Sequence, residues 1–104
     1  MIGRLWRGVA TREKANDYVA HLERSVFPEL GQIKGYRGVY VLRREVNESI
    51  EFTVLTFWES MAAIHQFAGE DAETAVVPPA AQTLLQAFDS TVTHYEIALQ
   101  QEPR

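Results

Sequence analysis

The chain contains no cysteine, and this absence excludes several classes of function at once. A protein without thiols has no disulfide framework, no thiolate metal site and no cysteine nucleophile. The same composition is typical of the reducing cytoplasm, where we expect the protein to act. Its three histidines, His21, His65 and His94, lack any spacing known for a metal site, so we expect no bound metal ion.

Long apolar runs and an excess of positive charge are missing as well. Arg4 and Arg7 interrupt the apolar residues near the N-terminus, so this segment does not resemble a signal peptide. No apolar run reaches the length of a membrane-spanning helix. The formal net charge is −4. This balance argues against nucleic acid or an anionic membrane as the main partner.

Glycine is sparse and is not gathered into a phosphate-binding loop. Gly35 and Gly38 lie where a predicted strand begins, whereas a phosphate cradle precedes a helix. The motif of a nucleophile elbow is absent too. What remains is a chain of 104 residues that are 46% hydrophobic. We expect one domain, residues 1–104, with an adequate but small core.

Four stretches of the sequence predict β-strands. Residues 2–10 and 35–44 alternate between two faces, as strands do. Residues 50–58 are apolar on both faces, which is typical of a central strand or of a sheet covered on both sides. Residues 91–99 form the fourth predicted strand.

Helical periodicity and end signals predict the segments between the strands. The first helix follows the first strand, and Pro28 predicts a break or kink near its end. Ser60 is expected to cap the second helix, and Gly69 to stop it. Pro79 is expected to begin a last helix whose apolar positions extend to Phe88.

The resulting order, β-α-β-β-α-β, predicts an α+β domain of the ferredoxin-like class. In this class a four-stranded antiparallel sheet carries its helices on one face only. Because the strands look apolar on both faces, the second face needs a cover. The simplest cover is the same sheet from a second copy of the chain. We therefore expect a homodimer with packed sheets.

Five segments of the sequence resemble the antibiotic biosynthesis monooxygenase family of dimeric α/β-barrel proteins. They span about residues 2–98 and read RLWRG, KGYRG, LTFWES, FAGED and VTHYE. The resemblance implies the ferredoxin-like fold and the homodimer. For activity it implies cofactor-free oxygenation of polyketide quinols or haem degradation, and many members of the family have no assigned activity. The fold by itself does not decide among these functions.

The haem-degrading branch of that family implies residues that this chain lacks. Its working tryptophan falls on Phe67, and its haem-ligating histidine falls near Val77 and Pro78, which cannot bind iron. Its first-strand asparagine has no counterpart near Arg4, and Trp58 matches only a structural tryptophan. We therefore expect no haem, no Soret band on titration with haem, and no other cofactor.

Two polar residues are the candidates for catalysis. Arg4 shares a face of the first strand with Trp6 and could hold an enolate or phenolate. His94 could accept a proton near neutral pH. The alternatives are an arginine paired with Glu96 and a histidine buried for structural reasons. We expect other strands to separate the first and fourth strands, so Arg4 and His94 need not touch, although both could face one cavity.

Aromatic residues are the candidates for binding a substrate. Trp6, Trp58 and Phe67 would form the walls of a pocket between the sheet and the helices. Tyr40 and Tyr36 are expected to share a face of the second strand. Tyr40 would line the pocket as well, unless the two tyrosines pack in the core or at the dimer interface.

Ordinary structural roles account for the remaining polar residues. His21 and His65 lie between the apolar positions of their helices and are expected to face solvent. Glu70, Asp71 and Glu73 gather in a connector. Such a cluster could bind a hard cation, but a solvated loop or a helix cap explains it more simply.

Two functions follow from these expectations. The first is a cofactor-independent monooxygenase for a small aromatic compound, with His94 as the base and Arg4 as the anion holder. The second is a non-catalytic dimer that binds a small apolar molecule or serves as an accessory subunit. An open pocket of roughly a few hundred Å³, with both residues converging on it, favours the enzyme. A filled core with ordinary salt bridges favours the second function.

Overall fold

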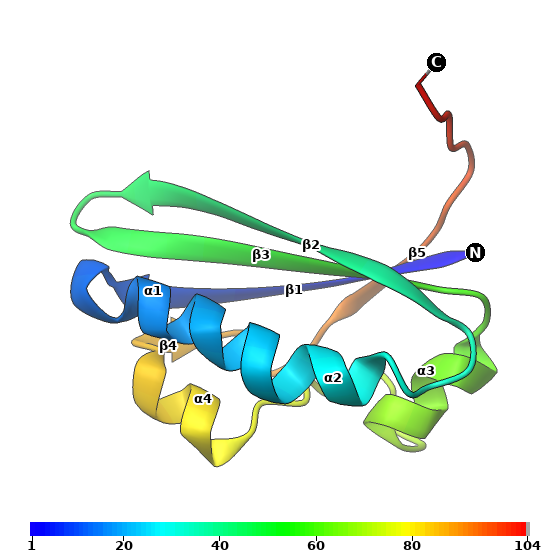
Figure 1. The fold of residues 1–104 in the computed structure, drawn as a ribbon, viewed down its shortest axis with the longest axis horizontal. Coiled ribbons are helices and arrows are strands. Elements are labelled where there is room, and N and C mark those ends of the chain that lie inside the picture. The colour runs from blue at the N-terminus through cyan, green and yellow to red at the C-terminus, as the bar shows by residue number, and fades with distance from the viewer. Residues whose placement is uncertain (104) are drawn as a thin grey trace.

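The protein, described here from a computed structural model over residues 1–103, has its helices on one face of an antiparallel sheet (Figure 1). The long strands are β1 (Ile2–Thr11), β2 (Tyr36–Val46) and β3 (Ser49–Trp58). Two short strands, β4 (Ala87–Phe88) and β5 (Thr93–Glu96), both pair with β1. The order is β2-β3-β1, with β4 and β5 sharing the remaining edge of β1. This confirms the predicted ferredoxin-like α+β fold.

The end of the chain differs from the prediction, because the last strand is divided in two. The last helix, α4 (Pro79–Leu84), ends before Phe88, which lies in β4. The backbone N–H groups of Gln86 and Asp89 donate hydrogen bonds to carbonyls of β1 at 2.7 and 3.0 Å. The ring of Phe88 lies 6.4 Å from that of Trp6. Pairing with β1 and this aromatic contact stabilise an extended segment where periodicity predicted helix.

The first helical region changes its hydrogen bonding near its end. It consists of α1 (Arg12–His21), a π-helical turn (Leu22–Val26) and α2 (Phe27–Leu30). The predicted irregularity therefore exists, but it spans Leu22–Val26, just before Phe27, where the break was expected. Proline lacks an N–H group and its ring crowds the carbonyl four residues earlier, and a widened turn relieves that contact.

A β-bulge in β2 overturns one predicted alternation. Tyr36 lies opposite Trp58, whereas Gly38 lies opposite the next residue, Phe57, so one extra residue is inserted in β2. Gly38 has a φ of 123°, a conformation that favours glycine. The inserted residue reverses the alternation, and Tyr36 and Tyr40 therefore lie on opposite faces of the sheet. The prediction that they share a face was wrong.

The helix after β3 matches its predicted ends. In α3 (Met61–Ala68) the Oγ atom of Ser60 accepts a hydrogen bond from the N–H of Ala63 at 3.2 Å. Gly69 follows the helix with a φ of 81°, in the region that glycine adopts without steric cost. Within residues 1–103, no helix is long and apolar enough to cross a membrane.

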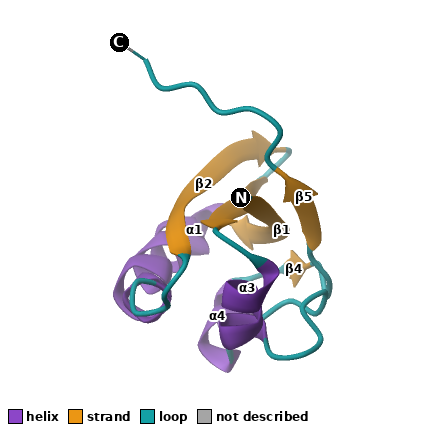
Figure 2. Ribbon diagram, turned by 90° about the vertical axis from the view of Figure 1, so that its right-hand side faces the viewer, coloured by secondary structure: helices purple, strands orange, loops and turns teal. Residues whose placement is uncertain are grey.

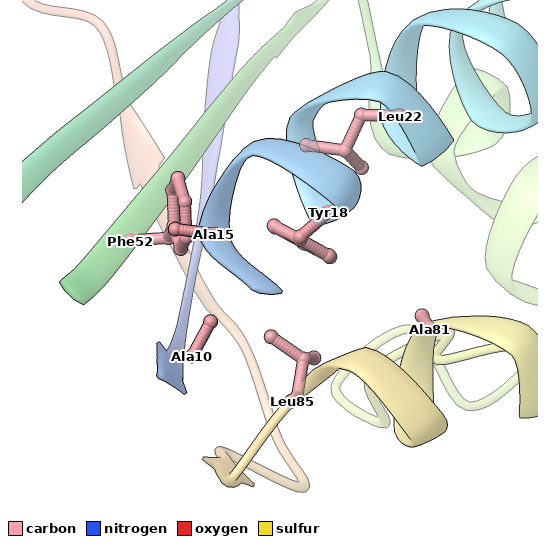
Figure 3. Close-up of a cluster of buried hydrophobic side chains, with 7 residues drawn as sticks. All are labelled: Ala10, Ala15, Tyr18, Leu22, Phe52, Ala81 and Leu85. Atoms are coloured by element: carbon pink, nitrogen blue, oxygen red, sulfur yellow. The ribbon is translucent and has the colours of Figure 1, made fainter. Parts of the chain in front are cut away.

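Two groups of buried side chains fill the space between the sheet and the helices. The group in Figure 3 surrounds Phe52 and Tyr18, whose ring centroids are 5.0 Å apart. The second group surrounds Trp58 and Ile64, near α3. Members of both groups line the cavity described below.

The opposite face of the sheet carries no helix (Figure 2). Tyr40 and Leu42 of β2 are 66% and 53% exposed, and Tyr95 of β5 is 53% exposed. We call this surface the open sheet face. It fits the sequence pattern, in which the strands are apolar on both sides.

Candidate functional site

A cavity of about 80 Å³ lies between the sheet and the helices. Side chains of β1 and β3 form its sheet wall, and α1, the π-helical turn and α4 contribute the helical wall. The connector between α3 and α4 adds Val76, Val77 and Pro78. Most of the surface is aliphatic or aromatic. A small number of polar groups therefore determine what the cavity can bind.

The connector is held against the edge of the sheet by main-chain hydrogen bonds. The N–H of Ala75 donates to the carbonyl of Ser90 at 2.9 Å, and the N–H of Val92 donates to that of Glu73 at 2.8 Å. These bonds fix the backbone carbonyls of the connector beside β1. They also explain why a segment without helix or strand can form a cavity wall.

Arg4 is the charged residue of the cavity wall, and it is only 4% exposed. Its Nη1 atom donates to the carbonyl oxygen of Ala72 and lies 2.9 Å from Nε2 of His94. Its Nη2 atom donates to the carbonyl oxygen of Thr74 at 3.3 Å. The guanidinium carbon lies 5.8 Å from the ring centre of Phe67, within the range of a cation–π contact.

None of these partners of Arg4 is a carboxylate. The alternative pairing with Glu96 is not formed, because Glu96 lies opposite Ile2 in the register of β1 and β5 and is exposed. Burial lowers the pKa of Arg4 to about 10, so the guanidinium remains protonated at neutral pH. The wall of an apolar cavity thus carries a positive charge that pairs with no acid among residues 1–103, a setting that favours an anionic ligand.

Arg4 and His94 are direct neighbours, contrary to the expectation that other strands separate them. They face each other across the pairing of β1 with β5, on the helical side of the sheet. The expectation was wrong because the ferredoxin-like order places the first and last strands side by side. His94 is next to the cavity through Arg4, although it does not itself line the wall.

His94 is held in its neutral form. Burial lowers the pKa of His94, and the positive charge of Arg4 lowers it further. Glu73 raises this pKa and His65 lowers it, both by smaller amounts. Since Arg4 can only donate, Nε2 of His94 must accept, which places the imidazole proton on Nδ1. The pair therefore combines a fixed cation with a neutral imidazole.

Of the predicted aromatic residues, Trp6 and Phe67 line the cavity, whereas Trp58 lies behind the wall. Trp58 is fully buried, and its ring stacks on that of Phe67 with the centroids 5.9 Å apart. Its indole N–H donates to Oγ1 of Thr56 at 2.9 Å. Trp58 therefore supports a residue of the wall and does not reach the cavity.

Tyr40 lies away from this cavity, on the open sheet face. Its ring meets that of Phe57 edge-on, with the centroids 5.9 Å apart. It borders a shallow groove together with Leu99 of the C-terminal segment. Any role of Tyr40 in binding therefore concerns this other surface.

His21 is the cavity residue that the sequence did not indicate. It was expected to face solvent, but it lines the cavity, and its Nε2 atom is buried without a hydrogen-bond partner among the described residues. The prediction failed because it considered only the contact of α1 with the sheet, whereas α4 also packs against α1. His65, by contrast, is exposed as predicted, with Nδ1 2.7 Å from the carbonyl oxygen of Gly69.

The acidic connector shows no sign of a cation site. Asp71 accepts a hydrogen bond from Oγ1 of Thr74 at 2.7 Å, as a turn residue does. Within residues 1–103, no three acidic or histidine side chains gather as metal ligands.

Solved structures with the same fold come from several organisms. MhuD, a haem degrader of Mycobacterium tuberculosis, matches in a form with two manganese protoporphyrins per active site. In that form the TM-score is 0.71 at 17% identity, over 99% of this chain and all of the other. A Bacillus cereus protein named after the antibiotic biosynthesis monooxygenases has a TM-score of 0.68 at 16% identity, over 98% and 97% of the two chains. Identities this low show that the fold is shared, and they carry no statement about activity.

Sequence comparison gives a more specific result. No curated protein matches the chain significantly. The family model described as antibiotic biosynthesis monooxygenase matches residues 9–78, which is well over half of the chain. The protein therefore belongs to the antibiotic biosynthesis monooxygenase family.

Proposed function

We propose that this protein is a cofactor-independent monooxygenase that acts on a small aromatic compound, such as a quinol or a polyketide-like phenol. The observation that carries the proposal is the buried cation of Arg4, which has no acidic partner in the part of the chain that the structure describes and faces an apolar cavity walled by Trp6 and Phe67. An aromatic ring suits such walls, and an ionised oxygen on the ring suits the guanidinium.

In the proposed reaction the substrate supplies all the electrons. A phenol enters with its hydroxyl group at Arg4 and displaces the 2.9 Å hydrogen bond between Nη1 of Arg4 and Nε2 of His94, so that the freed Nε2 accepts the phenolic proton. The resulting phenolate stays paired with the guanidinium and reduces molecular oxygen. One oxygen atom becomes a carbonyl on a ring carbon, which loses its single hydrogen. The other oxygen leaves as water with this hydrogen and the phenolic proton that His94 took up. Arg4 stabilises the anion before and during the oxygen step.

Replacing His94 by alanine is expected to lower kcat/KM for oxygen uptake about 100-fold, because proton transfer to a positioned base contributes at least that much. The pKa of His94 is lowered by burial and by Arg4, so the base stays neutral throughout the neutral range. Wild-type activity should therefore decline only below the ordinary histidine value of about 6.5. Oxygen uptake with a panel of anthrols and quinols, measured from pH 5 to 8, checks both expectations.

His65→Ala is the matched control for this experiment. His65 is exposed and does not line the cavity, so its removal should leave the rate at neutral pH unchanged. The pH profile should move only slightly, because His65 has the smallest effect on the pKa of His94. Equal oxygen uptake by wild type and His94→Ala would refute the proposed base. A lack of uptake with every substrate of the panel would count against the enzyme as a whole.

A haem-based function, suggested by the MhuD structures, fits this cavity poorly. Pockets for drug-sized ligands already measure about 300–1,000 Å³, and a porphyrin needs more than the 80 Å³ present here. Val77 and Pro78, which lie near the position of the haem-ligating histidine, line the cavity, and neither side chain has an atom that binds iron. No step of the proposed reaction therefore involves haem.

The second candidate function is non-catalytic binding of a small molecule or an accessory role. It is favoured by the cavity volume of about 80 Å³, which is below the few hundred Å³ expected for the enzyme, and by the position of His94 outside the cavity wall. The hydrogen bonds that already engage Arg4 favour it as well. This function predicts saturable binding of aromatic anions without oxygen uptake. Measuring binding and uptake on the same compounds separates the two functions.

We propose further that the protein is a homodimer in which two open sheet faces pack together. Tyr40 and Leu42 expose apolar surface there, because no helix among residues 1–103 covers this face. Leu42→Asp is expected to shift the protein from dimer to monomer, because a desolvated carboxylate without a partner is costly at the centre of an interface. Size-exclusion chromatography with light scattering at micromolar concentration measures the change.

Ala80→Asp is the matched control, because Ala80 is exposed on α4, on the helical side of the molecule. This variant should remain dimeric. A monomeric wild-type protein at micromolar concentration would contradict the proposed dimer, and so would a Leu42→Asp variant that stays dimeric.

A further inference from the structure

His21 has a feature that its place in the fold does not explain. Its Nε2 atom is buried and has no hydrogen-bond partner among residues 1–103, although the side chain lines the cavity. Buried polar atoms in native proteins nearly always have a partner, because an unpaired one loses its bonds to water and gains nothing in return. Because the side chain lines the cavity, a molecule bound there can supply the missing partner once the imidazole turns toward it.

Three other polar side chains of the cavity wall already have hydrogen-bond partners. The indole N–H of Trp6 donates to the carbonyl of Asp89 at 2.8 Å. The hydroxyl of Thr56 accepts from Trp58 at 2.9 Å. Arg4 is fixed by backbone carbonyls and by its neighbouring histidine. His21 and the hydroxyl group of Tyr18, for which no hydrogen bond is found among residues 1–103, are thus the polar groups of this wall whose hydrogen bonds are left open.

The backbone next to His21 is irregular, and Pro28 by itself accounts for this irregularity. His21 is the last residue of α1, directly before the π-helical turn Leu22–Val26. The ring of His21 stacks on that of Tyr18, with the centroids 6.4 Å apart, which fixes the plane of the imidazole.

We propose that His21 is a second polar contact for the substrate and determines its class. Arg4 belongs to the sheet wall and His21 to the helical wall, so a ligand between the walls meets a cation on one side and an imidazole on the other. The cavity then selects a compact aromatic compound with oxygen substituents at two positions, one bound by Arg4 and one by Nε2 of His21. This inference rests on the proposed function and extends it.

The test compares three probes, namely benzoate, 4-hydroxybenzoate and 4-hydroxybenzamide, by calorimetric titration of the whole protein. Wild type should bind 4-hydroxybenzoate about tenfold more tightly than benzoate, because the added hydroxyl completes the open hydrogen bond. In His21→Phe, which keeps an aromatic ring beside Tyr18, this preference, taken as the ratio of the two affinities in the same variant, should fall below twofold. His21→Gln, which restores a polar atom, should recover part of it.

The outcomes separate this inference from the proposed function. A hydroxyl preference that is absent in wild type, or that survives in His21→Phe, overturns the role of His21, for instance because a water molecule satisfies Nε2. A failure to prefer 4-hydroxybenzoate over 4-hydroxybenzamide contradicts the anion site at Arg4 and leaves the His21 result to be judged separately. Failure of all three probes to bind contradicts both.

Discussion

Replacing Arg4 by methionine is expected to reduce kcat/KM for oxygen uptake by at least about 100-fold, as expected for removal of a preorganised donor to a developing anion. Methionine keeps much of the length and the apolar contact with Phe67, but it has no charge and no N–H group. The substitution also leaves the carbonyls of Ala72 and Thr74 without their donor. Some loss of stability should therefore accompany the loss of activity, and thermal unfolding must be measured beside the rate.

Arg7→Met is the control for this variant. Arg7 belongs to the same strand but is exposed on the face away from the cavity, so the change removes the same charge without touching the site. We expect near-wild-type rates from it. If Arg4→Met is folded and retains full activity or full affinity for aromatic anions, Arg4 has only a structural role.

The Trp58→Ala variant is expected to lower the free energy of unfolding by about 3–5 kcal/mol, the usual cost of deleting a large aromatic side chain from a core. Trp58 is fully buried, packs on Phe67 and Tyr36, and donates a hydrogen bond to Thr56. The truncation creates a cavity and leaves a buried hydroxyl with one bond fewer. Urea unfolding followed by circular dichroism gives the difference directly.

Trp58→Phe is the matched comparison, since it keeps an aromatic ring and removes the indole N–H. It should cost clearly less than Trp58→Ala. The alternative role for Trp58, as a wall that contacts the ligand, makes a different prediction. A Trp58→Ala variant with nearly unchanged stability but no affinity for aromatic anions would show that Trp58 acts on the ligand and not on the core.

The parts of the fold that local chemistry determines were predictable from the sequence. Ser60 and Gly69 mark the ends of α3, because capping and a left-handed conformation each require only a few neighbouring residues. The long strands follow from alternation, and the ferredoxin-like class follows from their order. The cavity residues Arg4, Trp6 and Phe67 were also found, since their faces follow from the same periodicities.

What the sequence did not reveal depends on contacts between distant segments. The bulge after Tyr36 reverses the faces of β2, and no period-two pattern shows an inserted residue. Phe88 has helical spacing, yet hydrogen bonds to β1 make it a strand residue. His21 lines a cavity to which α4, about sixty residues further along the chain, also contributes. The contact of Arg4 with His94 could have been predicted, because the fold class itself fixes which strands are neighbours.

The central claim of this account is that Arg4 binds the ionised oxygen of an aromatic ligand inside the cavity. The most direct test is a spectrophotometric titration of 4-nitrophenol with the protein, because the phenol and its phenolate absorb at different wavelengths. We predict that binding lowers the pKa of the phenol, so that the phenolate band appears at a pH where the free compound is protonated, and that Arg4→Met abolishes this shift. Binding of the neutral phenol with an unchanged or raised pKa, or the same shift in Arg4→Met, would contradict the account.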